Sequence, residues 1–201
     1  IDTENVVIVN AAPVSRALIV RGEDGVPEQV CWSSNTQVPD TDVKERQSAR
    51  CLECKHNVRG AKARSCAYQQ VIAVVKEDAL EKVYRLKLPA TSIFGKNING
   101  MPIQEYVKYL AKNNTSVASI VTCIYKDTKS SWPRVLFKPV RSLTVEEVDT
   151  INEVSTQPKT IEAITLSVFG ESATPSPFNK VKGYIHKNYT NVYAMEHPIE
   201  E

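Results

Sequence analysis

The sequence is poor in the residues on which many active sites and nucleotide-binding loops depend. Its 201 residues include seven glycines and three histidines. No glycine-rich phosphate loop occurs, and His56, His186 and His197 do not have the spacing of a catalytic triad or of an HExxH zinc motif. The adjacent carboxylates Glu146 and Glu147 stand at an expected helix start, where the helix dipole accounts for them. We therefore expect a binding protein rather than an enzyme.

Long apolar segments are also absent. No window approaches the roughly 20 apolar residues of a membrane-spanning helix. The first residues lack the basic and then apolar pattern of a signal peptide. We therefore expect a soluble, cytoplasmic protein with no membrane partner, and a hydrophobic content of 42% is sufficient for a globular core.

Charge of one sign does not dominate the chain, because the formal net charge is only +2. The charges are nevertheless unevenly distributed. Residues 44–64 contain seven basic and two acidic side chains, a local net charge of about +5. Residues 142–172 contain six acidic side chains and one lysine, a local net charge of about −5. Contact with a polyanion would therefore depend on the basic middle segment.

The five cysteines are an odd number, and their spacing is typical of a metal site rather than of a disulfide framework. A CxxC motif presents two sulfurs to one metal ion. The expected zinc ligands are Cys31, Cys51, Cys54 and Cys66. His56 competes with Cys31 for the fourth position. Unrelated core cysteines and a redox-active CxxC are the alternative interpretations, and Cys123 is expected to pack in a core strand.

Short runs of β-branched residues alternate with turn signals and predict a mainly β protein with minor α. The expected strands are 6–9, 14–20, 29–32, 68–76, 83–88, 117–125 and 134–140, with a further strand at 161–169. One helix is expected at 103–110. A second begins with a capping box at Thr144 and ends near Ser155.

Binding of single-stranded nucleic acid requires cations for the phosphates and aromatic rings for the bases. The candidate cations are Arg50, Lys55, Arg59, Lys62, Arg64, Arg85 and Lys87. The candidate rings are Trp32, Tyr68, Tyr84, Tyr125 and Trp132. Each of these rings has an alternative role in core packing, which is the more common fate of an aromatic residue on a strand.

The order of several motifs is distinctive. These are Cys31-Trp32-Ser33-Ser34, Cys51-Leu52-Glu53-Cys54-Lys55-His56-Asn57, a basic run to Cys66, Tyr84-Arg85-Leu86-Lys87-Leu88-Pro89-Ala90-Thr91-Ser92 and Val121-Thr122. In this order, over roughly residues 28–140, the chain resembles bacteriophage single-stranded DNA-binding proteins of the OB-fold type. The resemblance implies a protein of the host-cell cytoplasm that coats or protects single strands in DNA replication or recombination.

The fold that this resemblance implies is a small OB-like Greek-key barrel with an inserted zinc-binding loop and one or two helices. Residues 1–172 would form this single domain, with the zinc loop at about 31–66. Residues 173–201 would be a flexible C-terminal arm with a basic and aromatic stretch and an acidic end. The arm would bind the strand, meet a replication or recombination protein, or dock on a second copy of the chain. The alternative function is a zinc-stabilised protein-interaction module.

Overall fold

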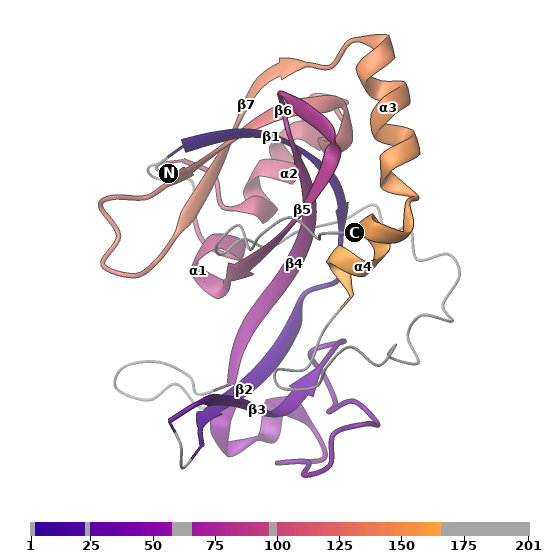
Figure 1. Cartoon of the computed structure of the whole chain (residues 1–201). Coiled ribbons are helices and arrows are strands. Elements are labelled where there is room, and N and C mark those ends of the chain that lie inside the picture. Colours follow the sequence, from indigo (N-terminus) through magenta and orange to yellow (C-terminus); the bar gives the residue numbers. More distant parts are fainter. Residues whose placement is uncertain (1–2, 23–24, 58–65, 97–99, 166–201) are drawn as a thin grey trace.

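The structure is a computed structural model that describes residues 3–22, 25–57, 66–96 and 100–165. This part of the chain is mainly β, with seven antiparallel strands in one open sheet (Figure 1). The strands are β1 (Thr3–Ala11), β2 (Ser15–Arg21), β3 (Pro27–Ser33), β4 (Cys66–Lys76), β5 (Ala79–Pro89), β6 (Ile120–Lys126) and β7 (Val135–Ser142). The helices are α1 (Ala90–Ile93), α2 (Ile103–Lys112), α3 (Val145–Ser155) and α4 (Pro158–Ile164), with short 3-10 turns η1 (Cys51–Glu53), η2 (Lys55–Asn57) and η3 (Val117–Ser119).

Strand β4 organises the sheet. Strand β5 pairs with β4 from Gln69 to Lys76. On the other side of β4, β1 pairs with residues 72–76 and β2 pairs with residues 66–69. Strands β6 and β7 extend the sheet beyond β1, and β3 extends it beyond β2. The ladders therefore form a wide upper part around β1 and a narrower lower part of β3, β2 and the start of β4, as Figure 1 shows.

The two strands expected on either side of residues 10–13 are confirmed, but the segment between them does not reverse the chain. Pro13 has no N–H to give to a ladder, and the pairing with β4 is interrupted there. The backbone N–H of Ala12 still donates to Val71 at 2.9 Å. The buried side chain of Gln70 donates through Nε2 to the carbonyl of Ala12 at 2.7 Å. The interruption is therefore bridged from β4, and β1 leads directly into β2.

The two faces of the upper sheet carry separate apolar cores. Because side chains alternate along a strand, Ile72 and Val74 of β4 lie on one face and Ala73 and Val75 on the other. The first face packs with α2 through Tyr106 and its neighbours. The second face packs against α3 and α4, and its core contains Val7, Val9, Ala73, Val75, Val83, Val121, Ile151, Val154 and Ala163.

The expected helix at 103–110, the hairpin of β6 with β7 and the capped helix that ends at Ser155 are confirmed. The expected strand at 161–169 is wrong over its described part, because α4 is a helix as far as Ile164. Pro158 is in its first turn, where a fixed φ and a missing N–H favour helix initiation. Residues 166–169 and the expected arm at 173–201 lie outside the described residues. The sheet is open, so closure into an OB-like barrel is not confirmed.

The N-terminus of α3 provides a pH-dependent contribution to stability. Glu147 accepts two hydrogen bonds of 2.8 Å from Arg141 and one of 2.8 Å from the Thr144 backbone. The Arg141 hydrogen bonds, followed by the Thr144 N–H, lower the pKa of Glu147 from 4.5 to about 2. A carboxylate whose pKa falls on folding stabilises the protein above its unfolded pKa, and this stabilisation disappears as the pH falls toward the folded value.

We therefore expect Glu147→Gln to reduce stability at about pH 7 and to have little effect at about pH 2. The measurement is urea unfolding of both proteins across this pH range, with a parallel series at high salt because the pair is exposed. A stability difference that stays constant from neutral to acid pH would contradict this assignment.

Candidate functional site

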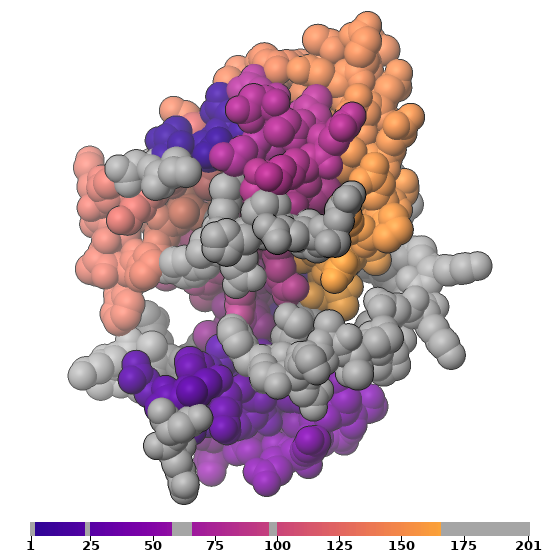
Figure 2. Space-filling model, viewed as in Figure 1, coloured from indigo at the N-terminus to yellow at the C-terminus, as the bar shows by residue number. Residues whose placement is uncertain are grey.

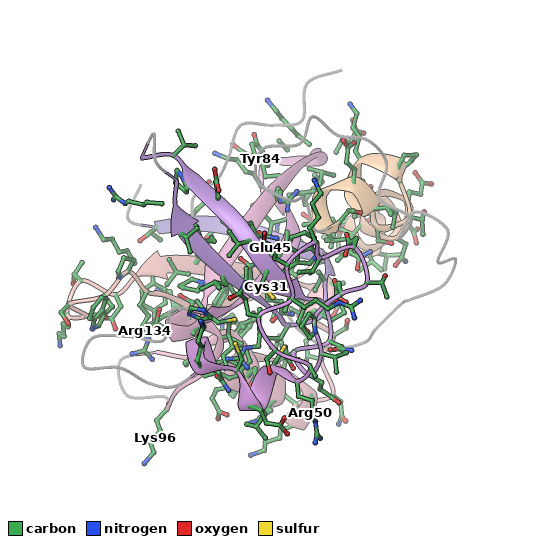
Figure 3. All side chains as sticks on the ribbon, turned by 90° about the horizontal axis from the view of Figure 1, so that it is seen from below. Cys31, Glu45, Arg50, Tyr84, Lys96 and Arg134 are labelled. Carbon is green, nitrogen blue, oxygen red and sulfur yellow. The ribbon has the colours of Figure 1, made fainter. Side chains whose placement is uncertain are left out.

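The lower part of the sheet brings four cysteines together. Cys31 on β3 and Cys66 on β4 both pair with Leu18 of β2, one on each side. Directly paired residues of antiparallel strands point to the same face, so both thiols lie on the face that carries Leu18. Cys51 and Cys54 are both buried. Figure 3 shows sulfur atoms gathered near the labelled Cys31 on the underside of the molecule.

Segment 34–57 belongs to the expected zinc loop, and from here we use that name for this segment. It folds over this face and forms the lower end of the molecule with β2 and β3 (Figure 2). Val43 packs with Leu18 and Cys31 in a small core of their own. Backbone and side-chain hydrogen bonds hold the loop in the absence of regular strands. Asp40 accepts from the Ser34 N–H at 2.9 Å, and the Cys51 N–H donates to Gln37 at 2.8 Å.

The other thiols lie close enough to Cys31 and Cys66 to affect the ionisation of these two side chains. Burial raises the pKa of Cys31, and Cys51 and Cys54 raise it further, while a hydrogen bond from the Gln47 N–H lowers it. The pKa of Cys66 is also raised by burial and by the other three thiols. Without a cation between them, a negative charge on one sulfur therefore disfavours a negative charge on the next.

The donor set fits a structural zinc ion, because four sulfurs can complete a closed tetrahedral site. As the side chains are placed, no three His, Cys, Asp or Glu groups in the described ranges form a ready-made metal-binding arrangement. The thiols would therefore have to draw together around the ion, which requires their deprotonation. Cys31 stands on the same sheet face as Cys66. The half-buried His56 stands on η2 and is not among the groups that affect the ionisation of Cys31 or Cys66.

Arg16 of β2 lies beside this cluster and was missed in the sequence. It is only 2% exposed, and its Nη2 donates to Asn57 Oδ1. Its guanidinium carbon stands 4.4 Å from the centroid of the Tyr68 ring. Tyr68 in turn packs edge-on against Phe94, with 5.3 Å between the ring centroids. Its position directly before the apolar run 17–20 of β2 is the one sequence signal that could have indicated it.

The basic candidates do not all lie on one surface. Arg50 is well exposed on the zinc loop and pairs with Glu53 at 3.3 Å, and Lys55 is exposed on η2. Arg85 and Lys87 alternate with the core residues of β5 and lie on its opposite face, which is the α3 and α4 side. The expected grouping of these two with the zinc loop is therefore not seen. Arg59, Lys62 and Arg64 lie outside the described residues.

The aromatic candidates also separate into different environments. Trp32 is half-buried against the Leu18 core, and Tyr84 packs on the main core with two lysine ammonium groups within 6 Å of its ring, at 5.8 and 5.7 Å. Tyr125 lies 5.4 Å from the Lys138 ammonium. Trp132 is 58% exposed. The half-buried Tyr68 packs against Phe94 at the end of α1, and Trp132 directly precedes Pro133, which accepts a hydrogen bond from Thr91 of α1.

We call this second region the α1 surface and define it by Tyr68, Phe94, Lys96, Trp132 and Arg134. Short helix α1 is fixed to the strand that follows Trp132, because Thr91 donates to the Pro133 carbonyl at 2.8 Å and the Val135 N–H donates to Ser92 at 2.9 Å. Phe94 is 39% exposed. Figure 3 shows Lys96 and Arg134 on the same side of the molecule. Phe94, Lys96 and Arg134 had no recognisable pattern in the sequence.

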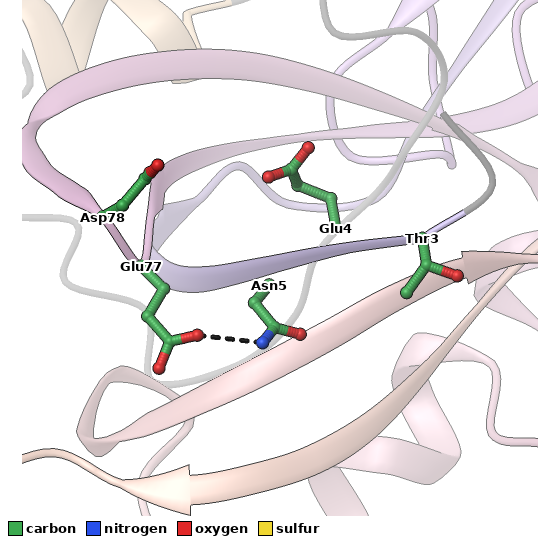
Figure 4. Close-up of a pocket in the computed structure, with 5 residues that line it drawn as sticks. All are labelled: Thr3, Glu4, Asn5, Glu77 and Asp78. Atoms are coloured by element: carbon green, nitrogen blue, oxygen red, sulfur yellow. Dashed lines mark hydrogen bonds between the residues drawn. The ribbon is translucent and has the colours of Figure 1, made fainter.

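A shallow hollow at the far end of β4 carries no comparable chemistry. It is lined by Thr3, Glu4, Asn5, Glu77 and Asp78 (Figure 4). Glu77 accepts from Asn5 and from Arg141, each at 2.8 Å, and Glu4 pairs with Lys76 at 3.4 Å. These carboxylates therefore stabilise the strand ends.

Comparisons with protein families, curated proteins and solved structures give no match. Within the described ranges, no helix has the length and apolarity needed to cross a membrane.

Proposed function

We propose that this protein binds single-stranded DNA with little sequence preference, and that a structural zinc ion in the four-cysteine cluster holds part of the binding surface. The observation that carries the proposal is the continuous chain of contacts from the zinc loop to the α1 surface. Asn57 of the zinc loop meets Arg16, Arg16 lies against Tyr68, and Tyr68 packs against Phe94.

This arrangement suits a single strand because bases and phosphates require different contacts. Partly exposed rings such as Phe94 and Trp132 offer stacking faces to bases of any identity. Lys96 is an exposed cation two residues after Phe94, and Lys55 is an exposed cation on η2 of the zinc loop; both could pair with phosphates. Stacking and charge without base-edge hydrogen bonds give affinity without sequence preference.

The zinc ion in this proposal is structural. Cys31, Cys51, Cys54 and Cys66 would fill its four positions and leave none open for a substrate or water. The ion would hold the zinc loop against β2 and β4, and no catalytic step is assigned to it. The proposed protein is therefore not an enzyme.

The broader assignment follows the motif resemblance. We propose an OB-like protein of a bacteriophage that coats or protects single strands in replication or recombination, in the cytoplasm of the host cell. The strands of the upper sheet would provide the OB-like part. The same proposal includes two kinds of protein partner, namely replication or recombination proteins and a second copy of the chain.

Removal of the stacking rings should weaken binding without unfolding the protein. We expect Phe94→Ala and Trp132→Ala each to reduce the affinity for an oligo-dT of about 30 nucleotides by about 5- to 100-fold. The measurement is fluorescence anisotropy of the labelled oligonucleotide. Tyr109→Ala is the matched control, since Tyr109 is also an exposed ring, at 44%, but stands on α2.

Equal affinities for all three variants and the unmodified protein would exclude the α1 surface as the binding site. If the unmodified, zinc-loaded protein failed to bind at all, the alternative would be favoured, namely a zinc-stabilised module that binds a replication or recombination protein. Pull-down of such a partner by the unmodified protein and its loss on zinc removal would then be the expected result.

A further inference from the structure

Arg16 is a buried cation with no visible counter-charge. Its Nε has no hydrogen-bond partner. Within residues 3–22, 25–57, 66–96 and 100–165, no carboxylate forms an ion pair with it. A buried charge that lacks a compensating charge is strongly destabilising. Its site is therefore incomplete unless a negative group is present nearby.

The thiol cluster on the same face is a source of such a charge. Arg16 and Leu18 are two residues apart on β2, so Arg16 points to the same face as the paired Cys31 and Cys66. Arg16 lies close enough to Cys66 for its charge to act on the sulfur of Cys66. Four neutral thiols carry no charge that could compensate the guanidinium. Four thiolates around a divalent cation carry a net charge of about −2.

The other side of Arg16 faces the α1 surface. The planar guanidinium lies over the Tyr68 ring, a contact that a lysine ammonium cannot reproduce in full. Asn57 joins the same guanidinium to the CxxC turn, because its Nδ2 also donates to the Leu52 carbonyl at 3.3 Å. One side chain thus contacts both the zinc loop and the first ring of the α1 surface.

We propose that Arg16 is a positioning residue that balances the charge of a four-thiolate metal centre and holds Tyr68 in place above it, so that metal loading and the α1 surface are coupled. The metal part rests on the zinc site that the proposed function places in the cysteine cluster, and it does not depend on DNA binding. The part that concerns the α1 surface rests on the proposed function.

The metal part is tested with Co²⁺ as the probe, because its absorption reports thiolate coordination directly. Arg16→Met keeps an unbranched apolar stem and removes the charge, and Arg16→Lys keeps the charge and removes the planar group. We expect Arg16→Met to bind Co²⁺ at least about tenfold more weakly than the unmodified protein, with Arg16→Lys between the two. Arg141→Met is the control, since Arg141 is an exposed arginine that pairs with Glu77 and Glu147 instead.

The inference is overturned if Arg16→Met binds Co²⁺ as tightly as Arg141→Met. Far-UV circular dichroism identifies any variant that fails to fold. If Arg16→Met is such a variant, the decision passes to Arg16→Lys, which must bind Co²⁺ more weakly than Arg141→Met.

Oligo-dT binding at saturating zinc separates the two proposals. We expect both Arg16 variants to bind oligo-dT several-fold more weakly than the unmodified protein, because the Tyr68 ring loses its contact with the planar guanidinium. If the unmodified protein binds and both variants bind equally well, the coupling is wrong and the proposed function stands. If the unmodified protein does not bind, the proposed function fails, and the Co²⁺ affinities still decide the role of Arg16.

Discussion

Cys54→Ser should abolish stable zinc binding and release the zinc loop. We expect the unmodified protein to retain about one zinc per chain after dialysis, and the variant to lose nearly all of it. Cys54 is buried between η1 and η2, and its carbonyl accepts from the Asn57 N–H at 2.9 Å. We therefore expect both turns to lose their fixed position when the metal is lost. The zinc loop should then become the first site of proteolysis.

The effect on stability should be large because the loop has little else to hold it. Its own small core contains Leu18, Cys31 and Val43, with Val30, Trp32 and Cys66 packed around it. Structural zinc sites contribute many kcal/mol in small domains, so we expect the midpoint of thermal unfolding to fall by about 10 °C or more.

Cys123→Ser is the control for this experiment. Cys123 is 3% exposed on β6 and stands in the upper sheet, away from the lower strands that carry the cluster. The Cys123→Ser variant should lose some stability because a hydroxyl replaces a buried thiol, but it should retain its zinc. Zinc content that is equal in Cys54→Ser and Cys123→Ser would refute the four-cysteine site.

Gly100→Ala should destabilise the upper part of the protein by about 3 kcal/mol or more. Gly100 has a φ of +135°, which a residue with a Cβ rarely adopts. A Cβ at this position would stand 1.8 Å from the hydroxyl oxygen of Tyr125 and 2.9 Å from its Cζ. The substitution therefore adds steric overlap to backbone strain, next to the bridge between Met101 and Phe137 that leads into α2.

Gly95→Ala separates these two effects. Gly95 has a φ of +136°, so its backbone strain matches that of Gly100, but the nearest atoms to its added Cβ are 3.5 Å away. We expect it to cost about 1 to 2 kcal/mol in urea unfolding, less than Gly100→Ala. Equal losses for the two variants would mean that Tyr125 moves aside without cost.

Much of the local structure could be predicted because it depends on near neighbours in the sequence. A continuous β-branched run identifies β4, strict alternation identifies β5, and Pro102 with the apolar positions of 103–110 identifies α2. The strand predicted at 161–169 is wrong over its described part, because a short apolar run fits a strand as well as a buried helix face. There the proline at 158, at the start of α4, was the stronger signal.

The candidate site could be predicted only in part, because it depends on how strands pair. The spacing of Cys51 and Cys54 indicates a metal ligand pair, but the alignment of Cys31 and Cys66 across Leu18 is a property of the sheet register. The same register buries Arg16 beside them. Arg85 was grouped with the basic loop because sequence alternation shows which residues share a face and not what that face meets.

The contact of Phe94 with Tyr68 joins residues that are 26 positions apart and that lie on either side of β5 in the chain. No periodic pattern connects them. Such a surface becomes visible only when the order of strands in the sheet is known. It adds Phe94, Lys96 and Arg134 to the binding residues that the sequence predicts.

The proposed function depends above all on salt-sensitive binding by a zinc-loaded protein. The decisive measurement is an anisotropy titration of labelled oligo-dT with the unmodified protein at about 50 and 200 mM salt, with zinc determined in the same sample. About one zinc per chain and a loss of affinity of about a hundredfold between the two salts, as five phosphate contacts would give, are the predicted results. A zinc-loaded protein that leaves the oligonucleotide unbound at the lower salt would contradict the proposal.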